Sequence, residues 1–110
     1  MIDWSRVRQL QQEVGAEDFD EVVELFLEEV EAVMARLASL PDRSQLGQDL
    51  HCLKGSALNL GFSAFSDLCH IGEFAAETGA ADSIDVAQII QCYAKSKETF
   101  LRNYRQQIAA

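Results

Sequence analysis

Apolar residues recur every three or four positions along most of this chain, which is the spacing of helices that bury one face. The clearest stripe predicts a helix from about Glu17–Asp18 to about Leu40, and Pro41 is expected to end it. Its apolar positions are Phe19, Val22, Val23, Phe26, Val30, Val33, Met34 and Leu37. The segment Pro41–Ser44 is predicted to be a tight connection to the next helix.

Two further helices flank this one. A short helix is predicted from Asp3, as its N-cap, to about Val14, with Gly15 ending it. After the tight connection, a third helix ends at Gly61. Successive side chains of a helix are turned by about 100°, which gathers the apolar residues of this third helix into one narrow stripe. This stripe must face a core. The stripe consists of Leu46, Leu50, Leu53, Ala57 and Leu60.

Two more helices complete the chain. Ser63 is the predicted N-cap of a helix over residues 64–78, which stops at the glycine that follows. After a loop, Asp85 or Ser83 caps a last helix that runs to about Gln107. Four long helices with short connections pack most simply as an antiparallel up-and-down four-helix bundle. The predicted fold class is therefore all-α, with the short N-terminal helix as a lid on one end of the bundle.

Composition agrees with one small domain over residues 1–110. Nearly half of the residues are apolar (48%), which is enough for a core, and 110 residues are too few for two independent cores. The formal net charge is −9, and residues 1–31 carry ten of the acidic side chains against only Arg6 and Arg8. No Lys/Arg cluster offsets this charge, so neither nucleic acid nor a membrane surface is an expected partner. An acidic helix face of this kind is typical of a solvated surface.

Three cysteines, Cys52, Cys69 and Cys92, lie far apart without the paired spacing of a metal site. We find no N-terminal segment that combines basic residues with an apolar run, and no apolar stretch long enough to cross a bilayer. We expect free thiols, a cytoplasmic location and a chain that is a complete, monomeric domain.

The stretch Leu50–Gly61, LHCLKGSALNLG, carries the candidate chemistry. His51, Lys54, Gly55 and Leu58 share a flank of the third helix that points away from the core stripe. Neutral imidazole is a nucleophile near physiological pH, and a lysine one turn along can neutralise a phosphoryl group. A glycine inside a helix costs about 0.5–1 kcal/mol relative to alanine, so its presence suggests a close approach to the backbone.

The pattern H-x-x-K-G-S-A-x-x-L-G resembles the signature of histidine-containing phosphotransfer (HPt) domains. The matching residues are His51, Lys54, Gly55, Ser56, Ala57, Leu60 and Gly61. The segments IDWSRVRQL, VVELFLEEV and FSAFSDLCHIGEFAAETG are also similar to helices of that family.

The resemblance implies that His51 is phosphorylated through its outward ring nitrogen by an aspartate of a receiver domain, and passes the group to another receiver. Lys54 would steady the phosphoryl group, and Glu73 would hold the other ring nitrogen of the histidine. Gly55, Leu58 and Ser56 would contact the receiver. The expected partners are response-regulator receiver domains or a hybrid sensor histidine kinase. The chain would need no cofactor of its own, since the receiver supplies magnesium.

Two positions depart from the pattern of relatives. Glu77 stands where some carry a basic residue, and Leu58 stands where smaller residues are frequent. A second cation near the phosphoryl group would then come from elsewhere, such as the partner.

Other interpretations remain open at the level of sequence. His70, Glu73 and Glu77 have a spacing that a metal site could use, although a solvated flank is the commoner reason for it. The bundle could be a non-catalytic adaptor that binds receiver domains without phosphotransfer. It could also be the dimerising hairpin of a sensor kinase, but Cys52 stands where an acid would follow the histidine, and no proline comes a few residues later. K-G-S reverses the G-K-[ST] order of a nucleotide-binding loop, so a kinase activity is not expected.

Overall fold

The computed structural model describes residues 1–39 and 43–108, and within them the chain is helical with no β-strand. The helices are α1 (Trp4–Val14), α2 (Phe19–Ser39), α3 (Leu46–Leu60), α4 (Ser63–Glu77) and α5 (Val86–Ile108). Short 3-10 turns, η1 (Arg43–Gln45) and η2 (Ala81–Ser83), precede α3 and α5. The predicted helix boundaries are correct to within one or two residues, except that the predicted end of the second helix at Leu40 and Pro41 lies outside the described residues.

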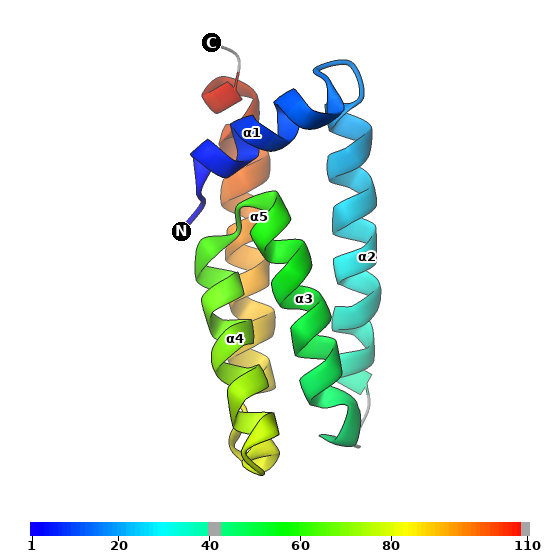
Figure 1. Ribbon diagram of the computed structural model, residues 1–110, viewed down its shortest axis with the longest axis vertical. Helices are drawn as coiled ribbons and strands as arrows, with labels where there is room; N and C mark the ends of the chain where they lie inside the picture. The colour runs from blue at the N-terminus through cyan, green and yellow to red at the C-terminus, as the bar shows by residue number, and fades with distance from the viewer. Residues whose placement is uncertain (40–42, 109–110) are drawn as a thin grey trace.

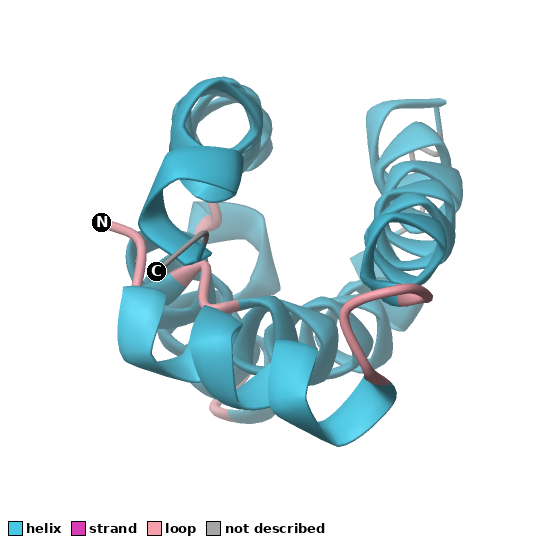
Figure 2. Cartoon of the chain, turned by 90° about the horizontal axis from the view of Figure 1, so that it is seen from above, coloured by secondary structure: helices cyan, strands magenta, loops and turns pink. Residues whose placement is uncertain are grey.

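Helices α2 to α5 run alternately down and up and form an elongated bundle, and α1 crosses one end of it (Figure 1). Seen from above, α1 runs from the N-terminus along one side of the bundle to the loop that leads into α2 (Figure 2). The predicted all-α, antiparallel four-helix bundle with an additional N-terminal helix is confirmed.

The core runs the length of the bundle and is most aromatic near α1. Phe62 packs against Phe100 with ring centroids 5.4 Å apart, and Phe100 stacks on Trp4 of α1 at 5.8 Å. Phe62 and Phe100 are at most 1% exposed. Aromatic packing therefore joins α1 to the turn between α3 and α4 and to α5.

The buried stripe of α2 is turned slightly around the helix from the predicted one. Val22 and Phe26 are only half-buried, whereas Leu27, which the predicted stripe omitted, is buried. Helix α2 contacts α1, α3 and α5, and the direction from which these helices pack decides which edge of its apolar face is buried.

Two predicted caps are confirmed and one is wrong. The Asp3 carboxylate accepts a hydrogen bond from the Arg6 backbone N–H at 3.2 Å, and Asp85 accepts one from the Gln88 N–H at 3.0 Å. Ser63 is not an N-cap; it is the first residue of α4, and its hydroxyl donates to the Met1 carbonyl at 2.7 Å. The Ser63 hydroxyl binds Met1 because the N-terminal segment folds back over the α3–α4 turn.

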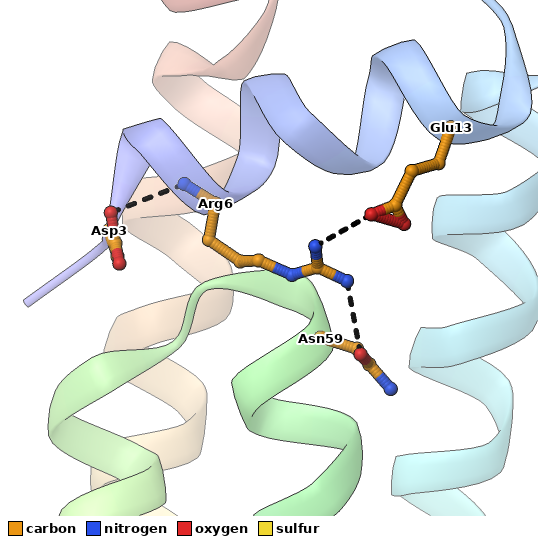
Figure 3. A network of polar contacts seen from close by, with 4 residues as sticks. All are labelled: Asp3, Arg6, Glu13 and Asn59. Atoms are coloured by element: carbon orange, nitrogen blue, oxygen red, sulfur yellow. Dashed lines mark hydrogen bonds and ion pairs between the residues drawn. The ribbon is translucent and has the colours of Figure 1, made fainter.

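This fold-back centres on Gly61, which ends α3 with φ +79°. The Asp3 N–H donates to the Gly61 carbonyl at 2.7 Å, and Ile2 pairs with Phe62 in an isolated antiparallel bridge. Arg6 adds a polar clamp, because its guanidinium bonds Asn59 of α3 at 3.1 Å and Glu13 of α1 at 3.0 Å (Figure 3). The C-terminal end of α3 is thus held by α1.

Candidate functional site: the histidine flank of α3

His51 lies in the middle of α3 with its side chain 71% exposed. The ring is nevertheless held from behind, because Nδ1 lies 2.5 Å from Oε2 of Glu73 on α4. The Glu73 side chain is only 10% exposed. A solvent-facing imidazole is therefore oriented by a buried carboxylate from the neighbouring helix.

Two glycines allow α3 and α4 to lie close enough for this contact. A Cβ on Gly47 of α3 would stand 3.2 Å from the Cβ of Ala76, which is tighter than ordinary van der Waals contact. A Cβ on Gly72 of α4 would stand 2.7 Å from Cδ1 of Leu50. Small residues on both helices thus set the approach that places Glu73 beneath the histidine.

The same carboxylate binds Lys54. The Lys54 ammonium donates to Oε1 of Glu73 at 2.5 Å, while His51 uses Oε2. The hydrogen bond from Lys54 lowers the pKa of Glu73, and the bond from His51 lowers it too, although burial acts in the opposite direction. Glu73 is therefore ionised at neutral pH and can only accept hydrogen bonds.

An acceptor-only partner decides the tautomer of the imidazole. Since Glu73 offers no proton, Nδ1 of His51 carries the hydrogen and donates it. Nε2 of the neutral ring then holds its lone pair, on the side of the ring away from Nδ1. The arrangement prepares a nucleophilic nitrogen at an exposed position.

Lys54 differs from its predicted surroundings in one respect. The sequence placed it beside His51, facing an incoming phosphoryl group, and the structure has its ammonium paired with Glu73. Its side chain is still 23% exposed, and an ammonium carries three N–H donors, of which this bond uses one.

The remaining predicted contact residues line the flank around His51. Nothing lies within 4 Å of a Cβ built on Gly55, so open space faces this residue. Leu58 is 57% exposed, which is unusual for a large apolar side chain, and Ser56 is half-buried. The fold leaves Gly55 and Leu58 accessible from outside.

Sequence reasoning missed a hollow of about 530 Å³ beside His51. Gln48 and Glu77 line it from α3 and α4, and Arg43 of η1 also lines it. The Arg43 guanidinium donates to the carbonyls of Ala81 and Ile84 at 2.8 and 3.0 Å, so it pins η2 to the start of α3. Gly47, about one turn before His51, was the available signal, since a small residue there implies a close neighbouring helix.

The other candidate ligands do not gather into a metal site. Over residues 1–39 and 43–108, no three side chains of His, Cys, Asp or Glu are arranged to hold a metal ion. The three cysteines are free thiols, and burial raises the pKa of the Cys69 thiol to about 12. His70 is exposed on α4.

The family model described as Hpt domain matches residues 21–109. The chain belongs to the Hpt domain family. Helix α1 and the first two residues of α2 lie outside the matched residues, and the rest of α2 and all of α3 to α5 lie within them. Comparisons with curated proteins and with solved structures give no significant match.

At the level of the family, an Hpt domain is a phosphotransfer module of a phosphorelay, a phosphoryl carrier rather than a kinase, and interacts with receiver domains. None of the helices in the described part of the chain has the length and apolarity needed to cross a membrane.

The shared carboxylate predicts an acid-sensitive contribution to stability. Because its folded-state pKa is below the usual 4.5, Glu73 stabilises the fold above about pH 4.5, and this contribution is lost as the pH falls through the lowered value. Glu73→Gln is expected to lower the free energy of unfolding by about 1–2 kcal/mol at pH 7. Urea titrations at pH 7 and at several values below 4.5 should show the gap to the wild type narrowing with acid.

Glu77→Gln is the matched control, since Glu77 is exposed one turn further along α4. It should leave the free energy of unfolding at pH 7 within about 0.5 kcal/mol of the wild type. If the difference in free energy of unfolding between Glu73→Gln and the wild type stays constant down to acid pH, Glu73 does not stabilise the fold through its ionised form.

Proposed function

We propose that this protein carries a phosphoryl group on His51 between two receiver domains of a phosphorelay. One observation supports this most directly: the imidazole is exposed while a buried, ionised carboxylate holds its Nδ1–H, which leaves Nε2 with its lone pair. A carrier nitrogen must be both nucleophilic and reachable by the partner's active site.

In the proposed step, the Nε2 lone pair attacks the phosphorus of a phospho-aspartate on the donor receiver. The N–P bond forms as the bond from phosphorus to the aspartyl oxygen breaks, and the carboxylate leaves with the electron pair. The Nδ1 proton stays in its bond to Glu73, which stabilises the positive charge that develops on the ring. Transfer to the second receiver is the same step in reverse, with that receiver's aspartate as the nucleophile.

Lys54 would contribute electrostatic stabilisation of the phosphoryl oxygens. Its ammonium is held near His51 by the shared carboxylate and retains two further N–H donors. Phosphoryl transfer depends mainly on positioning and charge neutralisation, so a cation held there suits the reaction. Magnesium would be supplied by the receiver.

Gly55, Leu58 and Ser56 would form the contact surface for the receiver. The open space at Gly55 admits a partner loop, and the exposed Leu58 offers apolar area to bury on contact. The receivers would be separate response regulators or part of a hybrid sensor histidine kinase. We place this exchange in the cytoplasm, which the odd number of cysteines supports.

A phosphotransfer assay tests the proposal. The purified protein is incubated with a phosphorylated receiver, and acid-labile, base-stable phosphate is followed on it before a second receiver is added. Label should appear on the protein and then move to the second receiver. A protein that binds receivers but takes no label from any native donor would instead be the adaptor, and the phosphotransfer proposal would be wrong.

The role of Gly55 gives a separate prediction. Gly55→Gln should fold, because nothing lies within 4 Å of the added Cβ, but its side chain would occupy the space left for the receiver loop. Transfer from the phosphorylated receiver is expected to slow by about tenfold to a hundredfold, as a displacement of reacting groups by an ångström does. Rapid-quench kinetics would measure the rate.

Ala94→Gln is the control for this variant, because Ala94 is an exposed helical residue of α5 that accepts the same side chain far from the histidine in sequence. It should transfer at the wild-type rate. An unchanged rate in Gly55→Gln would show that receivers do not approach this part of α3.

A further inference from the structure

The two most exposed large apolar side chains of the described residues stand together on α4, outside the histidine flank. Ile71 is 64% exposed and Phe74 is 63% exposed. Positions 71 and 73 are about 200° apart around a helix, so Ile71 points away from the side on which Glu73 meets His51. This surface needs an explanation other than the proposed phosphotransfer.

An apolar groove adjoins these residues where α4 packs against the start of α5. It has a volume of about 170 Å³. Leu68, Ile71 and Ala75 line it from α4, and Ile84 and Ile89 line it from the α5 side. The groove runs between two helices, which is the shape that accepts apolar side chains of a third helix.

The rim of the groove is acidic. Asp85 lines the groove, and Asp67 and Asp82 are next in sequence to Leu68 and Ser83, which also line it. All three acidic side chains are exposed, and none of them forms an ion pair with any residue in the described ranges. Between Lys54 and Lys95 the sequence contains no lysine or arginine. Arg43 reaches this end of the bundle, but its guanidinium is bonded to backbone carbonyls of the η2 region.

We propose that the α4–α5 groove, with Ile71 and Phe74 beside it, is a docking surface for a basic amphipathic helix of a partner protein. The apolar stripe of that helix would cover Ile71, Phe74 and the groove, and its lysines or arginines would meet the acidic rim. Complementary charge of this kind speeds association and selects among partners. A second copy of this chain does not fit, since a two-fold interface would place the same acidic rim against itself.

This surface leaves the histidine flank free. A partner helix bound there would hold the protein while receivers exchange the phosphoryl group at His51, and a tethered partner reacts at a raised effective concentration. Binding of a helix at this surface does not depend on phosphorylation of His51.

The test uses a synthetic helical peptide of about 18 residues, with leucines on one face and lysines on the other. A scrambled peptide of the same composition, without an apolar face, is its control. Binding is measured by fluorescence anisotropy at about 0.15 M salt. At this ionic strength, attraction between exposed charges more than roughly 8 Å apart is screened, so long-range attraction contributes little to the affinity. The amphipathic peptide should bind at least about tenfold more tightly than the scrambled one, and amide NMR shifts should change most at Ile71, Phe74 and Ile84.

The double variant Ile71→Asp/Phe74→Asp should fold, since both side chains are exposed, and should lose about tenfold or more in affinity for the peptide. Asp67→Asn/Asp82→Asn should weaken binding and reduce its dependence on salt. Leu25→Asp is the matched control, because Leu25 is 56% exposed on α2 beside Glu21, Glu28 and Glu29, and it should bind the peptide as the wild type does.

Three outcomes would overturn the proposal. The first is equal binding of the scrambled peptide. The second is an equal loss of affinity in Leu25→Asp. The third is a concentration-dependent dimer in light scattering that Ile71→Asp/Phe74→Asp abolishes, which would make the surface a contact between copies of this chain.

Discussion

The His51→Ala variant is expected to acquire no phosphoryl group from a phosphorylated receiver, under conditions in which the wild type is fully labelled. The variant removes the Nε2 lone pair that forms the N–P bond, so the loss should be complete rather than partial. The fold should survive, because the side chain is 71% exposed and lies outside the core. Radiolabelled transfer, followed by acid and base treatment, measures the effect.

His70→Ala is the matched control, since His70 is the only other histidine of the sequence and is also exposed. It should still take up label. Circular dichroism and urea unfolding of both variants separate lost chemistry from lost structure. Label on His51→Ala equal to that on the wild type would place the phosphoryl group on another residue.

Gly61→Ala is expected to produce the largest loss of stability for one added methyl group. Gly61 has φ +79°, a backbone conformation that costs an L-residue about 1–2 kcal/mol. Its added Cβ would also stand 2.7 Å from the Asp3 carbonyl oxygen and 2.9 Å from Cγ2 of Val7. Together these effects should lower the free energy of unfolding by about 2–4 kcal/mol, measured by urea titration.

Two other glycines separate the causes. Gly79 has φ +82° with nothing within 4 Å, so Gly79→Ala tests the cost of a positive φ without a steric clash and should cost about 1–2 kcal/mol. Gly55 is helical with open space, so Gly55→Ala should stabilise the fold by about 0.5–1 kcal/mol. If Gly61→Ala lowers the free energy of unfolding no more than Gly79→Ala does, the added methyl group does not clash with α1, and the assigned packing of α1 on the α3–α4 turn is wrong.

The sequence by itself was sufficient for the helices and the exposed histidine. Helix periodicity is a local property, and each stripe, cap or glycine stop can be identified within a few residues. The same 100° step separated His51 and Gly55 from Leu50 and Leu53 before any contact was known. The errors occur where a distant segment competes, as at Ser63, whose hydroxyl binds Met1 instead of capping α4.

Contacts between helices were decided only by the tertiary structure. The resemblance suggested that Glu73 lies near His51, but not that one buried carboxylate binds both His51 and Lys54, or that Gly47 and Gly72 let the helices approach. Nor could periodicity show that Ile71 and Phe74 lie uncovered beside a groove, since apolar residues on a helix predict burial. Such features depend on how helices distant in sequence pack, and no local pattern contains that information.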